Sequence, residues 1–158
     1  MDKNQFTELV LESEVSMYRI AKSILVRECD CEDAMQEAVL KAYENLDSLH
    51  EERYFKTWLT RILINEARRI RKSQARLLLL EDSAVESIGM EHNRLNERSE
   101  LYDAIMRLKL KIRITVVLHY IEGYSVEETA KILRVPTGTV KSRLHSGRTL
   151  LRKELEDE

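Results

Sequence analysis

The feature that most limits the fold is a shortage of turn residues, because the 158-residue chain contains one proline and four glycines. Sheet-rich folds need frequent turns, and Gly and Pro supply the backbone conformations that many turns require. Between these few residues the chain is rich in Leu, Glu, Lys, Arg and Ala, which all favour the α-helix. The composition therefore predicts an all-α protein, with enough residues for one ordinary domain or two small ones.

The stretch from 125 to 152 predicts two helices around a tight turn. Ser125 and Glu128 have the spacing of a capping box, which starts a helix at 125 or 126. That helix has a narrow apolar face at spacings of four and three, formed by Val126, Ala130 and Leu133. Pro136 ends it, because proline lacks an N–H and disfavours the helical conformation of the residue before it.

A longer helix follows the proline, with Thr137 as the predicted N-cap. Its apolar stripe recurs at steps of four, three, four and four, and consists of Val140, Leu144, Gly147, Leu151 and Leu155. The other side carries hydroxyl groups, a histidine and cations but no acid: Lys141, Ser142, Arg143, His145, Ser146, Arg148, Thr149 and Arg152. A short capped helix before a longer basic helix is typical of the helix-turn-helix, whose second helix enters the major groove. The alternative is a helical hairpin with a solvated basic face.

The segment EGYSVEETAKILRVPTGTVKSRLHSGRTLLRKEL resembles region 4, the DNA-binding C-terminal region, of the extracytoplasmic-function (ECF) sigma factors of bacterial RNA polymerase. GTVKSRLH is the most specific part. The resemblance implies a winged-helix-like helix-turn-helix domain that reads the minus-35 promoter element. By position, the minus-35 contacts would be Thr139, Lys141, Ser142, Arg143, His145, Ser146 and Arg148. Arg134 stands where the family usually has glycine; in a left-handed conformation, a residue other than glycine costs on the order of 1 kcal/mol.

The net charge of −2 conceals two alternations of sign along the chain. Residues 28 to 52 contain nine acids and one base, and residues 53 to 76 contain eight bases and one acid. Further on, residues 81 to 103 contain seven acids and two arginines, whereas residues 131 to 153 contain seven bases and no acid. This segregation predicts two nucleic-acid-binding surfaces on a protein that is not basic overall. The alternative is ordinary solvated charge.

The N-terminal part predicts two amphipathic helices. The first, over residues 4–27, has an apolar face of Phe6, Leu9, Val10, Tyr18, Ala21, Ile24 and Leu25. Asp30 is the predicted cap of the second, which runs from 31 to about 46. Its predicted buried stripe is Met35, Val39, Ala42 and Leu46, and its outward residues are Asp33, Gln36, Glu37, Lys41 and Glu44.

The motif DCEDAMQEAVLKAYENL in this second helix resembles the polymerase-docking helix of the same sigma family. In the family, that helix binds the clamp coiled coil of the largest core subunit. By this match, Asp33, Gln36 and Glu37 are the candidates for docking on core polymerase. Taken alone, they are an ordinary polar helix face.

A third helix is predicted over YFKTWLTRILINEARRIRK, with its apolar residues near one face. Trp58 is on that face, so we expect it in the core rather than as a platform for base stacking. FKTWLTRILIN resembles the family's region for melting and reading the minus-10 element. The minus-10 candidates, chosen by position or as phosphate-binding cations, are Tyr54, Lys56, Arg61, Asn65, Arg68, Arg69 and Lys72. Many relatives carry an acidic or amide residue where Arg69 stands.

The resemblance covers essentially the whole chain and divides it into three parts: sigma region 2 over residues 1–72, a linker over 73–96, and sigma region 4 over 97–158. The linker is expected because residues 73–96 lack a clean helical period. Its four consecutive leucines at 77–80 are expected to tuck against a neighbouring helix. In region 4, two further helices are expected before Gly123, and the break between them near 110 is weakly marked because the proline common there in relatives is missing.

The implied function is that of a sigma factor that directs promoter-specific transcription initiation in response to envelope or other stress. The implied partners are core RNA polymerase (clamp of the largest subunit and flap of the second largest), promoter DNA and an anti-sigma factor. A helix-turn-helix regulator of the response-regulator type, which binds duplex DNA without being a polymerase subunit, is the alternative.

Other classes of protein are disfavoured by what the sequence lacks. It has no glycine-rich phosphate loop, metal-ligand cluster or nucleophile constellation, so neither an enzyme nor a cofactor is expected. Cys29 and Cys31 are expected to be free thiols, because two cysteines are too few for a disulfide framework. No apolar run reaches about 18 residues and the N-terminus is acidic, so a cytoplasmic protein is expected.

Overall fold

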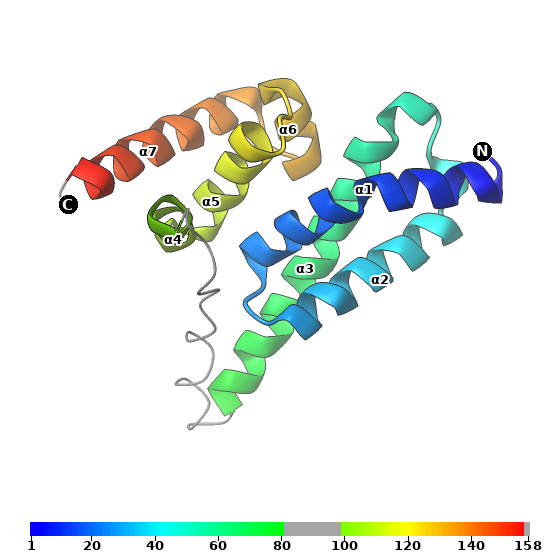
Figure 1. The fold of residues 1–158 in the computed structure, drawn as a ribbon, viewed down its shortest axis with the longest axis horizontal. Helices are drawn as coiled ribbons and strands as arrows, with labels where there is room; N and C mark the ends of the chain where they lie inside the picture. The colour runs from blue at the N-terminus through cyan, green and yellow to red at the C-terminus, as the bar shows by residue number, and fades with distance from the viewer. Residues whose placement is uncertain (81–98, 157–158) are drawn as a thin grey trace. The chain divides into compact units, whose positions relative to one another are not determined.

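A computed structural model describes residues 1–80 and 99–156, which form helices and the short turns between them (Figure 1). These described residues contain no strand, and the chain divides into two compact units, Met1–Glu91 and His92–Glu158. The predicted all-α fold with two small helical domains is confirmed.

The first unit is built from three helices: α1 (Lys3–Ile24), α2 (Glu28–Glu44) and α3 (Phe55–Leu80). Two short 3₁₀ turns, Leu46–Ser48 and Glu52–Tyr54, join α2 to α3. Each helix packs against the other two, and their shared core contains Phe6, Met17, Ile20, Phe55, Leu59, Leu63 and Ile64. A capping box between Asp2 and Gln5 starts α1, since each side chain accepts a hydrogen bond from the backbone N–H of the other.

The packing of α2 differs from the prediction in two respects. The helix begins at Glu28, and its N-cap is Arg27, which makes no side-chain cap bond. Asp30 is therefore not the cap, and the Asp30 carboxylate instead accepts a hydrogen bond from Gln74 of α3. The buried stripe consists of small side chains, Cys31, Ala34, Ala38 and Ala42, whereas Met35, Val39 and Leu46 are half-buried. Small residues leave room for neighbouring helices to approach α2 closely, so the larger apolar residues lie at the edge of the contact.

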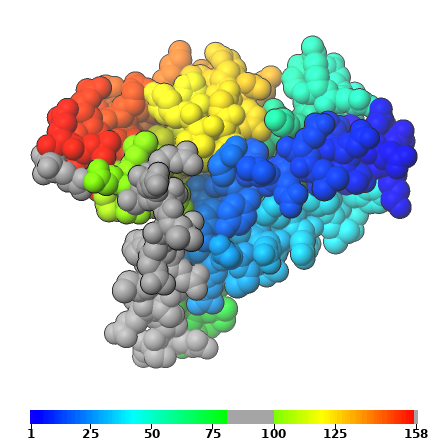
Figure 2. All heavy atoms as spheres, viewed as in Figure 1, coloured from blue at the N-terminus to red at the C-terminus, as the bar shows by residue number. Residues whose placement is uncertain are grey.

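The predicted linker is partly wrong, because α3 continues unbroken from Phe55 to Leu80. Residues 73–80 are therefore helical, and the remainder of the predicted linker lies outside the described residues. Leu77, Leu79 and Leu80 do not tuck against a neighbour, since they are 56%, 84% and 82% exposed. The end of α3 reaches past α1 and α2 (Figures 1 and 2), so its sequence needs no apolar stripe for packing against them. The segment is nevertheless helical, because leucine favours the helix.

The second unit contains α4 (Ser99–Arg107), α5 (Leu110–Val116), a π-helical turn (Val117–Ile121), α6 (Val126–Leu133) and α7 (Thr137–Glu156). Its core joins Leu108, Val116, Ala130, Val140 and Leu144. The break between α4 and α5 is made without proline: Lys109 is extended (φ −58°, ψ 144°), and the buried Arg113 donates to the carbonyl oxygens of Met106 and Leu108 at 2.7 and 3.3 Å. The guanidinium thus satisfies two carbonyls at the end of α4.

The helix-turn-helix forms as predicted from the local signals. Ser125 Oγ accepts a hydrogen bond from the Glu128 N–H at 3.0 Å, and a Glu128 carboxylate oxygen accepts from the Ser125 N–H at 2.9 Å. Arg134 is left-handed (φ 56°, ψ 49°) and is the one residue other than glycine with positive φ in the described part of the chain. Thr137 is the first residue of α7 rather than its cap.

The predicted apolar stripe of α7 is confirmed over most of its length. Val140, Leu144 and Gly147 are buried and Leu151 is half-buried, but Leu155 near the end is exposed. Gly147 lies against α5 so closely that a Cβ built there would be 2.7 Å from Val116 Cγ2. The absence of a side chain at 147 therefore allows α5 and α7 to pack together.

Candidate polymerase and nucleic-acid interfaces

The outward side of α2 carries the three predicted docking residues. Asp33 and Gln36 are exposed and Glu37 is half-buried. Their spacing of three and four places them together on one side of the helix, away from the buried stripe of Cys31 and the alanines. The structure therefore brings these three side chains into one polar surface that the unit's own core does not use.

An apolar groove of about 580 Å³ lies between α1 and α2 beside this polar surface. Gln36 lines the groove and also belongs to this polar surface. The groove is bordered by apolar side chains that are substantially exposed, namely Leu11, Leu40 and Tyr43. The sequence pattern did not predict it, because the expected α2 stripe would have buried Met35 and Val39 fully in the core.

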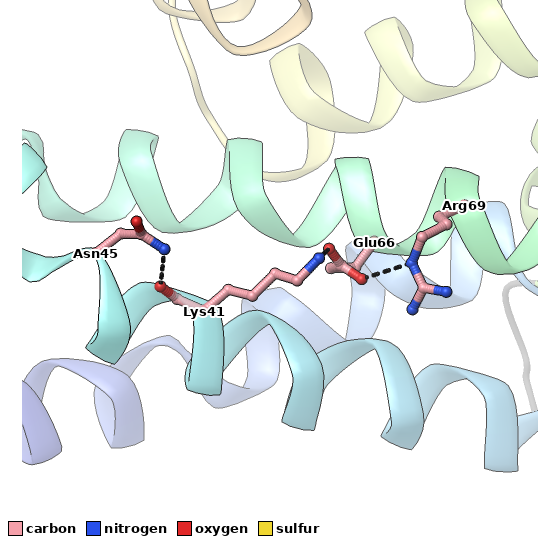
Figure 3. A network of polar contacts seen from close by, with 4 residues as sticks. All are labelled: Lys41, Asn45, Glu66 and Arg69. Atoms are coloured by element: carbon pink, nitrogen blue, oxygen red, sulfur yellow. Dashed lines mark hydrogen bonds and ion pairs between the residues drawn. The ribbon is translucent and has the colours of Figure 1, made fainter.

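A buried carboxylate joins α2 to α3 (Figure 3). Glu66 of α3 is 4% exposed and forms ion pairs with Lys41 of α2 and, at 3.0 Å, with Arg69 Nε one turn along α3. Burial alone would raise the pKa of Glu66, but the hydrogen bonds from Lys41 and Arg69 outweigh it and hold the pKa below its ordinary value of 4.5. Lys41 therefore does not simply point outward, as the helical pattern predicted.

The predicted minus-10 residues are largely brought together on α3. Arg61, Asn65, Arg68, Arg69 and Lys72 recur at spacings of three and four and share one side of the helix. Within this α3 basic face, Asn65, Arg69 and Lys72 are exposed, and Arg61 and Arg68 are half-buried. Lys56 is exposed near the start of α3, and its spacing places it on a different side of the helix.

Two aromatic residues stand at the start of α3. Tyr54 is 46% exposed, and the guanidinium carbon of Arg53 lies 4.8 Å from the centre of its ring. Trp58 packs against the core residue Phe55 at 5.8 Å between ring centres, yet it is half-buried and donates its Nε1–H to Ser48 Oγ at 3.2 Å. Trp58 therefore lies at the edge of the core and not in its interior, where it was expected.

The predicted minus-35 residues lie on α7 outside its buried stripe. Lys141, Ser142, His145 and Arg148 are exposed, and Thr139, Arg143 and Ser146 are half-buried. One contact on this surface was not predicted: Arg148 Nη1 donates to the hydroxyl of Tyr120 at 2.7 Å. Because Tyr120 belongs to the π-helical turn, where the regular helical period is interrupted, periodicity gave no signal for it.

The described residues hold no group of three His, Cys, Asp or Glu side chains placed to bind a metal ion. Both cysteines are free thiols, as predicted. Cys29 is exposed, whereas burial raises the pKa of the Cys31 thiol to about 11, and its Sγ lies 3.7 Å from the Leu25 carbonyl oxygen. No helix in the part of the chain that the structure describes is long and apolar enough to cross a membrane.

Comparison with known proteins matches both units to parts of sigma factors. The model of "Sigma-70 region 2" matches residues 9–77, and that of "Sigma-70, region 4" matches residues 98–151. The ECF RNA polymerase sigma factor SigW of Bacillus subtilis is 34% identical over 99% of this chain and 91% of its own. The RNA polymerase sigma-E factor of Streptomyces avermitilis is 33% identical over 96% of this chain and 86% of its own.

Solved structures give the same result. The sigma factor RpoE of Bartonella quintana, in complex with the anti-sigma factor NepR, aligns with a TM-score of 0.83 at 25% identity over 96% of this chain and 97% of its own. CnrH, in complex with the cytosolic domain of CnrY, aligns with a TM-score of 0.75 at 25% identity over 99% and 91%.

A region 2 unit followed by a helix-turn-helix region 4 unit defines a two-region sigma factor. The chain belongs to the ECF family of RNA polymerase sigma factors. Because the matches cover both units, they favour the predicted sigma factor over a helix-turn-helix regulator of the response-regulator type.

Proposed function

We propose that three surfaces of this sigma factor have separate roles in transcription initiation. The outward side of α2 docks on core polymerase, the α3 basic face binds and melts the minus-10 element, and α7 reads the minus-35 element. The observation that carries this proposal is the segregation of charge, since an acidic docking helix packs directly against a helix with a cationic side, and residues 137–153 of α7, in the other unit, contain no acid.

Docking is assigned to Asp33, Gln36 and Glu37 because the unit's own core leaves them outward. The proposed partner is the clamp coiled coil of the largest core subunit. Replacing Glu37 by Lys should weaken core binding in a pull-down without unfolding the unit, and Glu12→Lys, an exposed charge reversal on α1, serves as the control. Unchanged core binding for single substitutions at all three positions would remove the assignment.

The α3 basic face is proposed to contact the strand backbone during melting. Such contacts contribute a sequence-independent, salt-sensitive term to binding. Replacing Arg68 and Lys72 by Ala should therefore reduce open-complex formation on all promoters alike, measured by permanganate footprinting of the melted region. If footprints are unaffected, these cations do not contact the melted strand. Tyr54, at the start of α3, is proposed to stack on an unpaired base.

On α7, Ser142 and His145 are proposed to contact base edges, with Arg143 as a further candidate on the flank. Substituting a base-reading residue should change the preference at one minus-35 position by about 1–3 kcal/mol. Lys141 is assigned to phosphate, so its loss should weaken all sequences equally and reduce the salt slope by roughly one. If no outward substitution changes the sequence selected by holoenzyme, the minus-35 element is recognised elsewhere.

The same sigma factor is proposed to act in the cytoplasm, without enzymatic activity, and to be held by an anti-sigma factor until a stress signal releases it. Support comes from RpoE and CnrH, which were solved with NepR and with the cytosolic domain of CnrY. The flap of the second-largest core subunit is the proposed partner of the second unit. Titrating a candidate anti-sigma protein into a transcription reaction should abolish initiation, and excess sigma should restore it.

A further inference from the structure

The hydrogen bond between Arg148 and Tyr120 joins α7 to a residue outside the recognition helix. Arg148 shares its flank of α7 with Lys141 and Arg152, beside the residues that point directly away from the core. Its Nη1 donates to the Tyr120 hydroxyl at 2.7 Å, and Tyr120 is 50% exposed. The contact therefore lies on the surface, at the border of the proposed DNA-binding face.

Tyr120 is held in place by its own surroundings. It belongs to a π-helical turn, in which Glu122 N–H donates to the Val117 carbonyl at 2.9 Å, and such turns are rare and often found at functional sites. The His119 ring packs edge-on against the Tyr120 ring, with 4.8 Å between centres. His119 Nδ1 lies in turn 2.8 Å from the carbonyl oxygen of Tyr124, directly before the helix-turn-helix.

The chemistry of this pair suits an anion. A tyrosine hydroxyl that accepts a hydrogen bond still has its own proton to donate, and a guanidinium that uses one N–H here retains four more. Accepting a bond from a cation also polarises the hydroxyl and makes it a better donor. Tyr120 and Arg148 thus offer O–H and N–H donors side by side, and the segment of α7 that carries Arg148, residues 137–153, contains no acid.

We propose that Tyr120 and Arg148 form one phosphate-binding pair at the minus-35 element, in which both side chains donate to the same backbone phosphate. The inference rests on the proposed function of α7 and adds a DNA-contacting residue from outside it. An exposed contact of this kind stabilises a fold very little, so a purely structural role predicts no effect of Tyr120 on DNA binding.

The test uses holoenzyme reconstituted with the full chain carrying Tyr120→Phe, Arg148→Ala or both. Tyr102→Phe, on α4 of the same unit, is the matched control and should bind DNA as the unchanged protein does. Equilibrium binding is measured on a minus-35 library at several salt concentrations. Tyr120→Phe should weaken binding to every sequence by about tenfold, which is the usual effect of losing a hydrogen bond to a charged group.

The two single variants should differ in their salt dependence. The hydroxyl is neutral, so Tyr120→Phe should leave the salt slope unchanged, whereas Arg148→Ala should reduce it by about one. Replacing single phosphates of the promoter by neutral methylphosphonates then locates the contact. At one position the replacement should weaken binding by the unchanged protein, have a smaller effect on each single variant, and have little effect on the double variant.

Failure of the inference and failure of the proposed function give different results. If Arg148→Ala weakens binding while Tyr120→Phe matches the Tyr102→Phe control, the phosphate pair is refuted and the role of α7 stands. If Arg148→Ala, Ser142→Ala and His145→Ala all bind every minus-35 sequence as the unchanged protein does, the proposed function of α7 is refuted as well.

Discussion

Replacing Glu66 by Gln tests the buried ion-pair network that joins α2 to α3. Glutamine keeps one acceptor oxygen but places an NH₂ group against the second cation, so one charge-assisted hydrogen bond is lost. Stranding a fully buried charge costs about 3–5 kcal/mol, but the side chains of Lys41 and Arg69 are 41% and 59% exposed and can be hydrated. The loss of one hydrogen bond to a charged group, about 2 kcal/mol at pH 7, is therefore the expected destabilisation.

The pH dependence of this difference has a definite sign. The pKa of Glu66 is lowered in the folded protein, so its ionisation contributes stability that is fully present above the ordinary value of 4.5. That contribution is lost as the pH falls through the depressed folded pKa. The difference in unfolding free energy between the unchanged protein and Glu66→Gln should be constant near neutral pH and shrink in acid.

The assay is urea unfolding of the full chain, followed by the fluorescence of Trp58. This is the only tryptophan in the sequence, and it lies on α3 in the same unit as Glu66. Glu44→Gln, an exposed substitution on α2, is the control and should change stability by no more than about 0.5 kcal/mol. A Glu66→Gln variant as stable as this control at pH 7, or a difference that grows in acid, would refute the reasoning.

Three further predictions concern single positions. Gly147→Ala gains about 1 kcal/mol of helix propensity, but overpacking against Val116 costs about 1–3 kcal/mol. The net effect should be a less stable second unit, which circular dichroism would show as a lower thermal midpoint. Arg134→Gly should raise the unfolding free energy by about 0.5–1 kcal/mol, because it removes left-handed strain. Iodoacetamide at pH 8 should label Cys29 well before Cys31, as mass spectrometry would show, since burial shields Cys31 and raises its thiol pKa to about 11.

The features that sequence reasoning predicted well are those with local causes. The capping box of Ser125 and Glu128, the turn at Arg134 and the stop at Pro136 depend on residues within a few positions of one another. The stripe of α7 was likewise predictable, because large apolar residues and one glycine mark it. Local signals of this kind are sufficient to define the helix-turn-helix.

The errors arose where packing rather than local preference decides. In α2 the buried residues are alanines and Cys31, which a search for large apolar side chains overlooks. Residues 73–80 were predicted as linker because periodicity reports which side of a helix is buried, and at this end of α3 Leu77, Leu79 and Leu80 are exposed. A helix without a buried stripe has no period to find.

The sequence pattern could not predict which side chains of different helices contact one another. Glu66 was counted as the one acid in a basic stretch, yet it is buried and holds Lys41 and Arg69. Tyr120 and Arg148 are 28 residues apart and meet through an interrupted helix. The candidates for docking and DNA binding came from the resemblance and from the charge pattern, and the structure adds which of them are exposed and which are held by neighbours.

In vitro transcription with purified core polymerase and a randomised promoter library tests the central claim most directly. Core enzyme with this chain should initiate only on templates that share a minus-35 and a minus-10 element, and neither component alone should do so. Glu37→Lys should reduce the yield of transcripts, and Ser142 or His145 substitutions should change the selected minus-35 sequence. A chain that fails to join core polymerase and instead binds duplex promoter DNA tightly by itself would contradict the assignment.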